Sequence, residues 1–243
     1  MCGRWGSDAN IRSEGTLGIP QQYSVQLPQR CLRLIETLLP TARDVRMPGE
    51  EDAGPLVTTF ILAMSTPVLT LPIERVERHH GANAEGYVDD RHLSPAVAEA
   101  VAANLGGSPL RKSKFFQHNM WRFAALPYRE GLNFARHFPR DLVEALESAS
   151  ALEAAARMPA SKWASCLRNA LAHGGVVYLD AEGRQSHGQP TEHLAFVSGK
   201  PTEDRSSFEE IRVLRISRDD YIGFVQHWVG WLEQSGLSFE LAA

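Results

Sequence analysis

The sequence predicts a mainly α-helical bundle with a small antiparallel β-meander inserted before the C-terminal helix. Most of residues 23–173 consists of segments whose apolar residues recur at three- and four-residue spacing, with caps, prolines or glycines at their ends. After Gly175 the pattern changes to short apolar runs separated by polar turns. We expect the meander at about residues 176–217, within one domain over residues 23–243. Residues 1–22 contain four glycines and little periodicity, which predicts a flexible arm.

Helices are predicted in order along the first two thirds of the chain. Pro40 ends the first, and a strongly apolar helix is followed by a more amphipathic one after Pro72. Ser94 precedes a proline, an alanine-rich body and a Gly-Gly stop, which is typical of a capped helix. The predicted helical segments are residues 24–40, 56–65, 69–80, 94–107, 112–126 (one helix or several short ones), 140–158 (with a break near residues 148–150) and 159–173.

Three strands and a last helix complete the predicted order. Residues 176–180, 193–199 and 211–217 are short apolar runs between turns rich in polar residues, Gly and Pro, which favours strands. Ser217 lies three residues before Asp220, a spacing that resembles a capping box and predicts the start of an amphipathic C-terminal helix.

Composition favours a globular protein outside the membrane. Apolar residues make up 43% of the chain and the formal net charge is −4. The most apolar stretch, residues 56–73, contains Thr and Ser and is interrupted by Pro67 and Pro72, so it is a poor membrane span. The first residues lack the apolar core of a signal peptide.

The cysteines suggest reduced thiols and a cytoplasmic protein. Cys2, Cys31 and Cys166 lie far apart and form no CxxC pair. Cys166 is on the apolar side of its predicted helix, so we expect it in the core and not as a nucleophile.

Residues 108–140 form the most basic part of the chain, with seven Arg or Lys residues and a single Glu. Aromatic residues alternate with these cations, a combination that can stack bases and contact phosphates in RNA. The candidate RNA-binding residues are Arg111, Lys112, Lys114 and Arg122. The alternative is that the rings belong to the core, and we expect rings inward with arginines outward.

The stretch Arg168-Asn169-Ala170-Leu171-Ala172-His173 ends the predicted helix at residues 159–173. At 100° per residue, Trp163 and the apolar residues share one side of the helix. The opposite side has Arg168 on one flank and Asn169 with His173 on the other, separated by small Ser165 and Ala172. An arginine that holds phosphate charge and a histidine that moves a proton suit RNA cleavage by the ribose 2′-hydroxyl. The alternative is that both merely complement the helix C-terminus.

With Gly174, this stretch resembles the R-x4-6-H signature of the HEPN superfamily, in which a polar residue such as Asn169 follows the arginine. The order of elements over residues 56–232 is also similar. The resemblance implies a helical bundle that dimerises around the motif and often cleaves RNA without metal or another cofactor. It implies Arg168 and His173 as catalytic residues and Asn169 as a supporting one. Plasmid- or defence-associated bacterial proteins are the subgroup it suggests.

The same resemblance implies RNA, a second copy and an antitoxin protein as partners, in a toxin–antitoxin or other defence role. Two features depart from the family pattern. The β-meander is an addition to the bundle, and Gly174-Gly175 replaces the form in which a modifiable tyrosine follows the histidine. The alternatives are a catalytically inactive HEPN scaffold that binds RNA or a protein, and a helical protein unrelated to the family.

Other groups of polar residues give weaker indications of a functional site. His79, His80 and His92, and separately His187 and His193, lack zinc-site spacing, so we expect no metal. Asp89-Asp90 is expected in a solvated turn. The sequence has no GxxxxGK[ST], GxGxxG or GxSxG motif.

Overall fold

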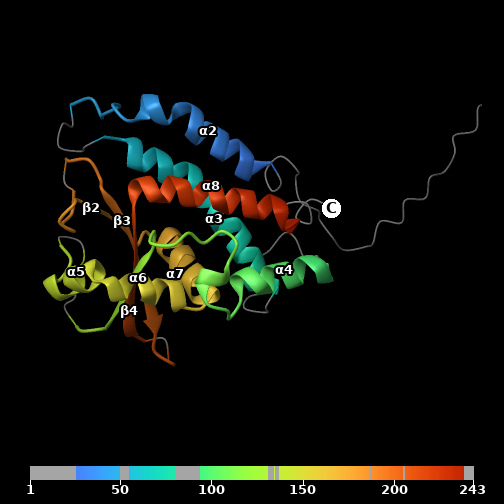
Figure 1. The fold of residues 1–243 in the computed structure, drawn as a ribbon. Helices are drawn as coiled ribbons and strands as arrows, with labels where there is room; N and C mark the ends of the chain where they lie inside the picture. Colours follow the sequence, from blue (N-terminus) through green and yellow to red (C-terminus); the bar gives the residue numbers. More distant parts are fainter. Residues whose placement is uncertain are drawn as a thin grey trace, which may run out of the picture.

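A computed structural model describes residues 26–49, 55–79, 94–130, 134, 137–186, 188–204 and 206–237. The predicted arm at residues 1–22 lies outside these ranges. The described chain forms seven α-helices and four strands (Figure 1). The helices are α2 (Leu27–Ala42), α3 (Val57–His79), α4 (Pro95–Leu105), α5 (Arg140–Glu147), α6 (Ala149–Arg157), α7 (Ala160–Ala172) and α8 (Arg218–Gln234), with a short 3₁₀ helix, η2 (Leu110–Lys112). The strands are β1 (Arg122–Pro127), β2 (Val176–Leu179), β3 (His193–Pro201) and β4 (Phe208–Ser217).

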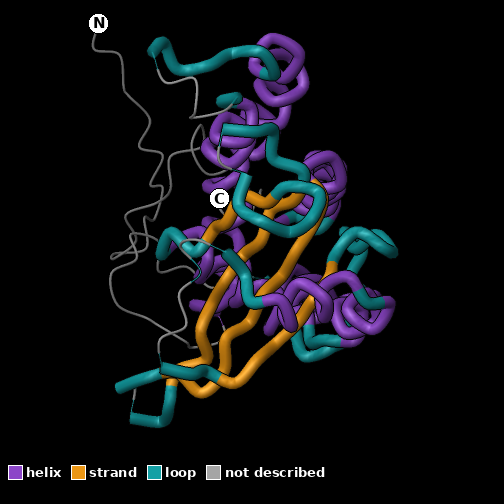
Figure 2. The backbone as a smooth tube through the Cα atoms, turned by 90° about the vertical axis from the view of Figure 1, so that its left-hand side faces the viewer, coloured by secondary structure: helices purple, strands orange, loops and turns teal. Residues whose placement is uncertain are grey.

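The prediction of a mainly helical bundle is wrong, because the structure is a mixture of helices and a four-stranded antiparallel sheet. Strands β2, β3 and β4 form the predicted meander, and β1 adds a fourth strand in the order β1-β4-β3-β2 (Figure 2). Residues 122–126, the end of the predicted helical segment 112–126, instead form β1 together with Pro127, and this strand pairs with β4 from Arg122 opposite Arg215 to Pro127 opposite Glu210. The open edge of β4 causes this segment to form a strand. Although β4 lies about 90 residues away in the chain, it offers main-chain hydrogen-bond partners to the segment.

Helices cover both faces of the sheet. Because successive side chains of a strand point to opposite faces, Leu214 and Ile216 pack with α3, α7 and α8, whereas Ile211 and Val213 pack with Leu142 of α5. The sheet therefore separates two hydrophobic clusters, and the larger one lies on the side of α7.

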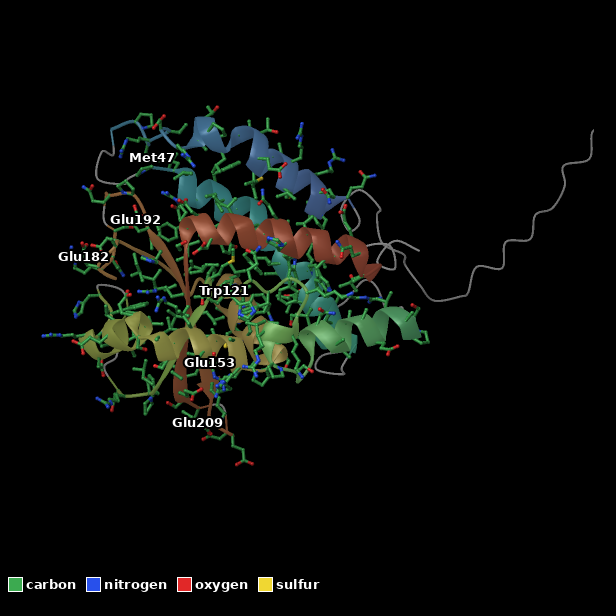
Figure 3. The ribbon with its side chains drawn as sticks, in the orientation of Figure 1. Met47, Trp121, Glu153, Glu182, Glu192 and Glu209 are labelled. Atoms are coloured by element: carbon green, nitrogen blue, oxygen red, sulfur yellow. The ribbon has the colours of Figure 1, made fainter. Side chains whose placement is uncertain are left out.

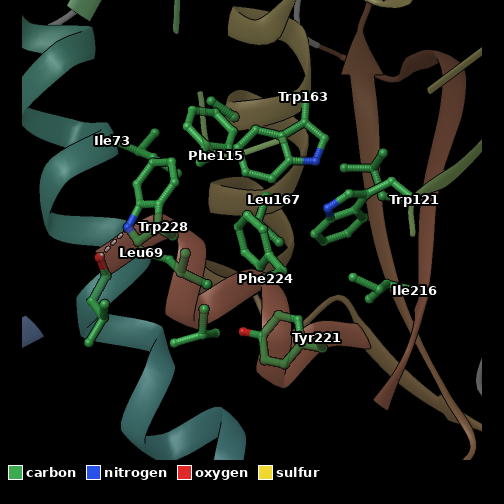
Figure 4. Packing of buried hydrophobic residues seen from close by; sticks show 14 of the residues in the cluster. Leu69, Ile73, Phe115, Trp121, Trp163, Leu167, Ile216, Tyr221, Phe224 and Trp228 are labelled. Carbon is green, nitrogen blue, oxygen red and sulfur yellow. Dashed lines mark hydrogen bonds between the residues drawn. The ribbon is translucent and has the colours of Figure 1, made fainter. Parts of the chain in front are cut away.

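Rings from distant segments fill the larger cluster. Phe115, Trp121, Trp163, Phe224 and Trp228 are all nearly fully buried and contact one another edge to face or tilted (Figures 3 and 4). The expectation that rings of residues 108–140 point inward is confirmed for Phe115, Trp121 and Phe138. Tyr128 is the exposed exception.

Helix α3 continues through Pro67 and Pro72, where the sequence predicts two separate segments. A proline lacks the N–H that would bond the carbonyl four residues earlier, so Pro72 leaves the Val68 carbonyl without its helical donor. Trp228 of α8 supplies a donor instead: its indole Nε1 lies 3.0 Å from the Val68 oxygen (Figure 4). The helix passes the proline because a neighbouring helix satisfies the backbone.

Helix α3 is also long and apolar enough, over Val57–Glu77, to cross a membrane by length and composition. In this fold it packs beside α2 and α8 (Figure 1), and Val68, Leu69 and Ile73 are at most 1% exposed. Burial in the core therefore accounts for its apolar composition.

Several predicted helix ends are confirmed. Ser94 Oγ accepts a hydrogen bond from the Val97 N–H at the start of α4. Ser217 Oγ accepts one from the Asp220 N–H at the start of α8. The break near residue 148 separates α5 from α6. These ends depend on short-range contacts, which a sequence displays directly.

Candidate functional site

Helix α7 has one apolar, buried side and one polar, more exposed side, as its sequence predicts. Trp163, Cys166, Leu167 and Ala170 are buried. Ser165, Arg168 and Asn169 are half-buried, and Ala172 and His173 are exposed. The polar side of α7 therefore reaches the surface along its length, with His173 at its C-terminal end.

Arg168 is held in place by Glu77, a residue that no sequence pattern indicated. Its Nη2 forms an ion pair and hydrogen bond with Glu77 Oε2, near the end of α3. The two side chains are only 25% and 24% exposed. Arg168 Nε is buried with no acceptor among the described residues. The arginine is thus oriented from α3, and in the part of the chain that the structure describes only its Nη2 has a hydrogen-bond acceptor.

His173 lies where α7 ends. Its backbone N–H bonds the Asn169 carbonyl at 3.0 Å, and Gly174 then takes φ +70°. The Gly175 N–H bonds the Ala170 carbonyl at 2.7 Å, which completes the turn toward β2. The His173 side chain is exposed and has no hydrogen-bond partner among the described residues.

Asn169 does not orient the histidine ring within one chain. Its side chain is half-buried, and no hydrogen bond joins it to the His173 ring in the described part of the chain. The hydrogen bond that joins the two residues in the described chain is from the His173 backbone N–H to the Asn169 carbonyl. A supporting role for Asn169 would therefore act on a substrate or on a second protomer.

The four candidate RNA-binding residues differ in their surroundings. Arg111 forms an ion pair with Glu153 at 3.2 Å, and Lys112 and Lys114 are exposed. Arg122 Nη1 instead donates to the carbonyls of Leu146, Glu147 and Ser148, at 2.9 to 3.1 Å. Arg122 therefore caps the C-terminus of α5, which explains its presence without a nucleic acid.

An open pocket of about 720 Å³ adjoins Arg168. Glu77, Lys162 and Arg212 line it with Arg168, and they come from α3, α7 and β4. No sequence pattern indicated Glu77, Lys162 or Arg212, because only the tertiary structure brings these elements together. The one local signal is the spacing of Ser161, Ser165 and Arg168, which places them on one stripe of α7. His173 does not belong to the lining.

The carboxylate of Glu210, on β4, forms ion pairs with two of the cations that line the pocket. Arg212 Nε donates to it at 2.7 Å, and Lys162 Nζ lies 3.7 Å away. The hydrogen bond from Arg212 holds the pKa of the Glu210 carboxyl below its usual value. This carboxylate therefore stays charged and fixes Arg212 at the edge of the pocket.

Cys166, on the buried side of α7, is only 1% exposed. Burial raises the pKa of its thiol. A buried, protonated thiol is a poor nucleophile, which agrees with the expectation that Cys166 belongs to the core.

No group of three or more His, Cys, Asp or Glu side chains comes together in the part of the chain that the structure describes. The side chains of His79, His80, His92 and His187, with Asp89-Asp90, lie outside that part. His193 is described, and its Nδ1 lies 3.3 Å from the Asp180 carbonyl.

The site therefore belongs to a protein of mixed helices and antiparallel strands, in which α3, α4, α7 and β4 line a pocket and α7 ends at a histidine whose side chain has no hydrogen-bond partner among the described residues. No protein-family model, curated protein or solved structure matches this chain.

Proposed function

We propose that the protein is a metal-independent endoribonuclease that acts as a homodimer through Arg168 and His173. The observation that supports this most is the state of His173, which is exposed and unpartnered among the described residues, five positions from an oriented arginine. Small residues, Ala172 and Gly174, flank it and permit close approach of RNA or of a second α7.

The chemistry requires two proton transfers. The ribose 2′-oxygen attacks its own phosphorus while a base removes its proton. The bond to the 5′-oxygen breaks, and an acid protonates that oxygen, leaving a cyclic phosphate and a free 5′-hydroxyl. One chain contributes one His173, so two protomers related by a two-fold axis would supply base and acid. Arg168 would stabilise the phosphate charge.

A second candidate is favoured by a different observation. The Glu77 carboxylate already neutralises Arg168 within one chain. An arginine engaged in this way suits a catalytically silent protein that binds RNA or a partner, with Arg168 as a structural residue of α7.

The two candidates differ in one assay. RNA is incubated in EDTA with the wild type, with His173→Ala and Arg168→Ala, and with His137→Ala as a matched change of another exposed histidine. The nuclease predicts cleavage that is lost in the first two variants and retained in the third. RNA binding without cleavage by the folded wild type would instead establish the second candidate. Light scattering measures the molar mass, and a monomer under cleavage conditions would contradict the composite site.

A further inference from the structure

We propose that the pocket beside Arg168 binds a small organic anion with an apolar body and a phosphate or carboxylate head. The pocket lies between α3, α4, α7 and β4, and it excludes His173. The pocket shares Arg168 with the proposed cleavage site, but binding of an anion there does not depend on RNA cleavage. Its volume of about 720 Å³ lies in the range of roughly 300–1,000 Å³ that is typical of small-molecule sites.

Part of the pocket lining is apolar. Ile73 and Val76 from α3 and Leu105 from α4 form it, and each is at most 4% exposed. This part of the lining thus belongs to the hydrophobic core. A ligand that contacts it must bring an apolar or aromatic surface, since a fully hydrated ion would gain nothing there.

The charged part of the lining has an excess of cations. Lys162, Arg168 and Arg212 line the pocket, against the single carboxylate of Glu77. Glu210 approaches Lys162 and Arg212 from outside the lining. Charge alone therefore favours an anion over a cation or a neutral ligand.

These cations also keep unused hydrogen-bond donors. A guanidinium has five N–H groups, and Arg168 uses one for Glu77 while the Nε of Arg212 bonds Glu210. The 3.7 Å between Lys162 Nζ and Glu210 exceeds hydrogen-bond length. Phosphate and carboxylate oxygens are the acceptors that such groups bind most strongly.

Two hydroxyls add to the polar part of the lining. Ser161 and Ser165 line the pocket on the same stripe of α7 as Arg168. Neither side chain has a hydrogen-bond partner among the described residues. They offer neutral donors and acceptors in addition to the cations.

The ion pair between Glu77 and Arg168 indicates how Arg168 would bind the acidic group of a ligand. Its carboxylate lies on the guanidinium inside the pocket lining, in the place where a ligand head group would bind. A ligand must therefore share Arg168 with Glu77 or displace it. The remaining two cations provide the attraction for that exchange.

The test is isothermal titration calorimetry of the full chain with phenyl phosphate and with benzoate. Inorganic phosphate and benzyl alcohol are the matched probes that lack the apolar body or the charge. We expect saturable binding of at least one aryl anion at or below about 1 mM, and weaker binding of both matched probes by about tenfold or more. The tighter of the two aryl anions identifies the head group.

Substitutions of lining residues test whether the anion binds in this pocket. Lys162→Gln and Arg212→Gln are expected to weaken the aryl anion by about tenfold or more, as loss of a charged hydrogen bond does. Lys162 is 30% exposed, so its variant tests the site even if Arg212→Gln fails to fold. Arg184→Gln, an exposed arginine paired with Asp180, is the control and should bind like the wild type.

Two results would overturn the proposal: no binding of either aryl anion, or binding that both folded pocket variants retain. Because binding is measured without RNA, this outcome is independent of the cleavage assay. A protein that binds the anion and leaves RNA intact would refute the proposed nuclease alone.

Discussion

Trp228 on α8 donates its indole N–H to the carbonyl of Val68 on α3, the carbonyl that Pro72 cannot bond. A residue 160 positions away in the chain thus lets a 23-residue helix continue past a proline. The consequence is that Trp228 has a hydrogen-bonding role in addition to its packing role.

Trp228→Phe should therefore destabilise the fold more than Trp163→Phe. Both indoles are fully buried, but the Nε1 of Trp163 has no acceptor among the described residues. Removing the Trp228 N–H leaves a buried carbonyl without a donor, at a cost of about 1–3 kcal/mol beyond the loss of packing. Urea denaturation of the two variants measures the difference. Equal losses would show that the Trp228 bond contributes little.

The free energy of unfolding should fall in acid as the Glu147 carboxylate becomes protonated. The Arg215 guanidinium, 2% exposed, bonds this carboxylate and holds its pKa below the usual value. A lowered folded-state pKa stabilises the fold above the unfolded-state pKa, near 4.5, and that contribution is lost as pH falls through the folded-state pKa. Glu147 is half exposed, so solvent reduces the effect to about 1 kcal/mol.

Glu147→Gln tests this contribution. Its unfolding free energy should approach that of the wild type as pH falls below about 4. Denaturant curves of both proteins between pH 3 and 7 measure it. A constant difference across that range would contradict the assignment.

His173→Ala should separate chemistry from stability. The side chain is exposed and unpartnered among the described residues, so the unfolding free energy should change by less than about 0.5 kcal/mol. Cleavage of RNA should fall by about a hundredfold or more if His173 transfers a proton. Thermal unfolding and a cleavage time course give the two values. Full activity in this variant would remove His173 from the mechanism.

Glu77→Gln should tighten binding of an aryl anion in the pocket. The change removes the carboxylate that competes for Arg168 and keeps the side chain's size. We expect an affinity gain of about three- to tenfold, the range of a partly exposed ion pair. Calorimetry with the better of phenyl phosphate and benzoate measures it, and an unchanged affinity would show that the ligand does not contact Arg168.

The two glycines after His173 should respond differently to alanine. A Cβ on Gly175 would lie 2.3 Å from the Val197 carbonyl oxygen, which is backbone of β3 and cannot move easily. At Gly174 the space is open, but φ is +70°. Gly174→Ala should therefore cost about 1 kcal/mol from backbone conformation, and Gly175→Ala clearly more. Melting temperatures of the two variants rank them, and the reverse order would contradict the described turn.

Short-range patterns in the sequence predicted a large part of what surrounds the site. Ser94 and Ser217 marked helix starts, and apolar spacing placed Trp163 and Leu167 inward on α7. The change of period after Gly175 predicted the strands of the meander. Each of these features depends on residues a few positions apart, so the local sequence is sufficient.

The helical prediction for residues 122–126 was wrong for a physical reason. Arg-Phe-Ala-Ala-Leu is compatible with helix or strand, and the available edge of β4 decides between them. The same holds for α3, whose prolines predict a break that Trp228 prevents.

The sequence by itself determined the polar stripe of α7, with Arg168 and His173 at defined positions along it. Only the tertiary structure decided what that stripe contacts. Packing of α3 and β4 against α7 brings Glu77 and Arg212 to Arg168, from 91 and 44 positions away in the chain, and leaves His173 at the surface. Ion pairs and pockets join residues that share no local pattern, because they form only after the hydrophobic clusters have set the positions of the elements.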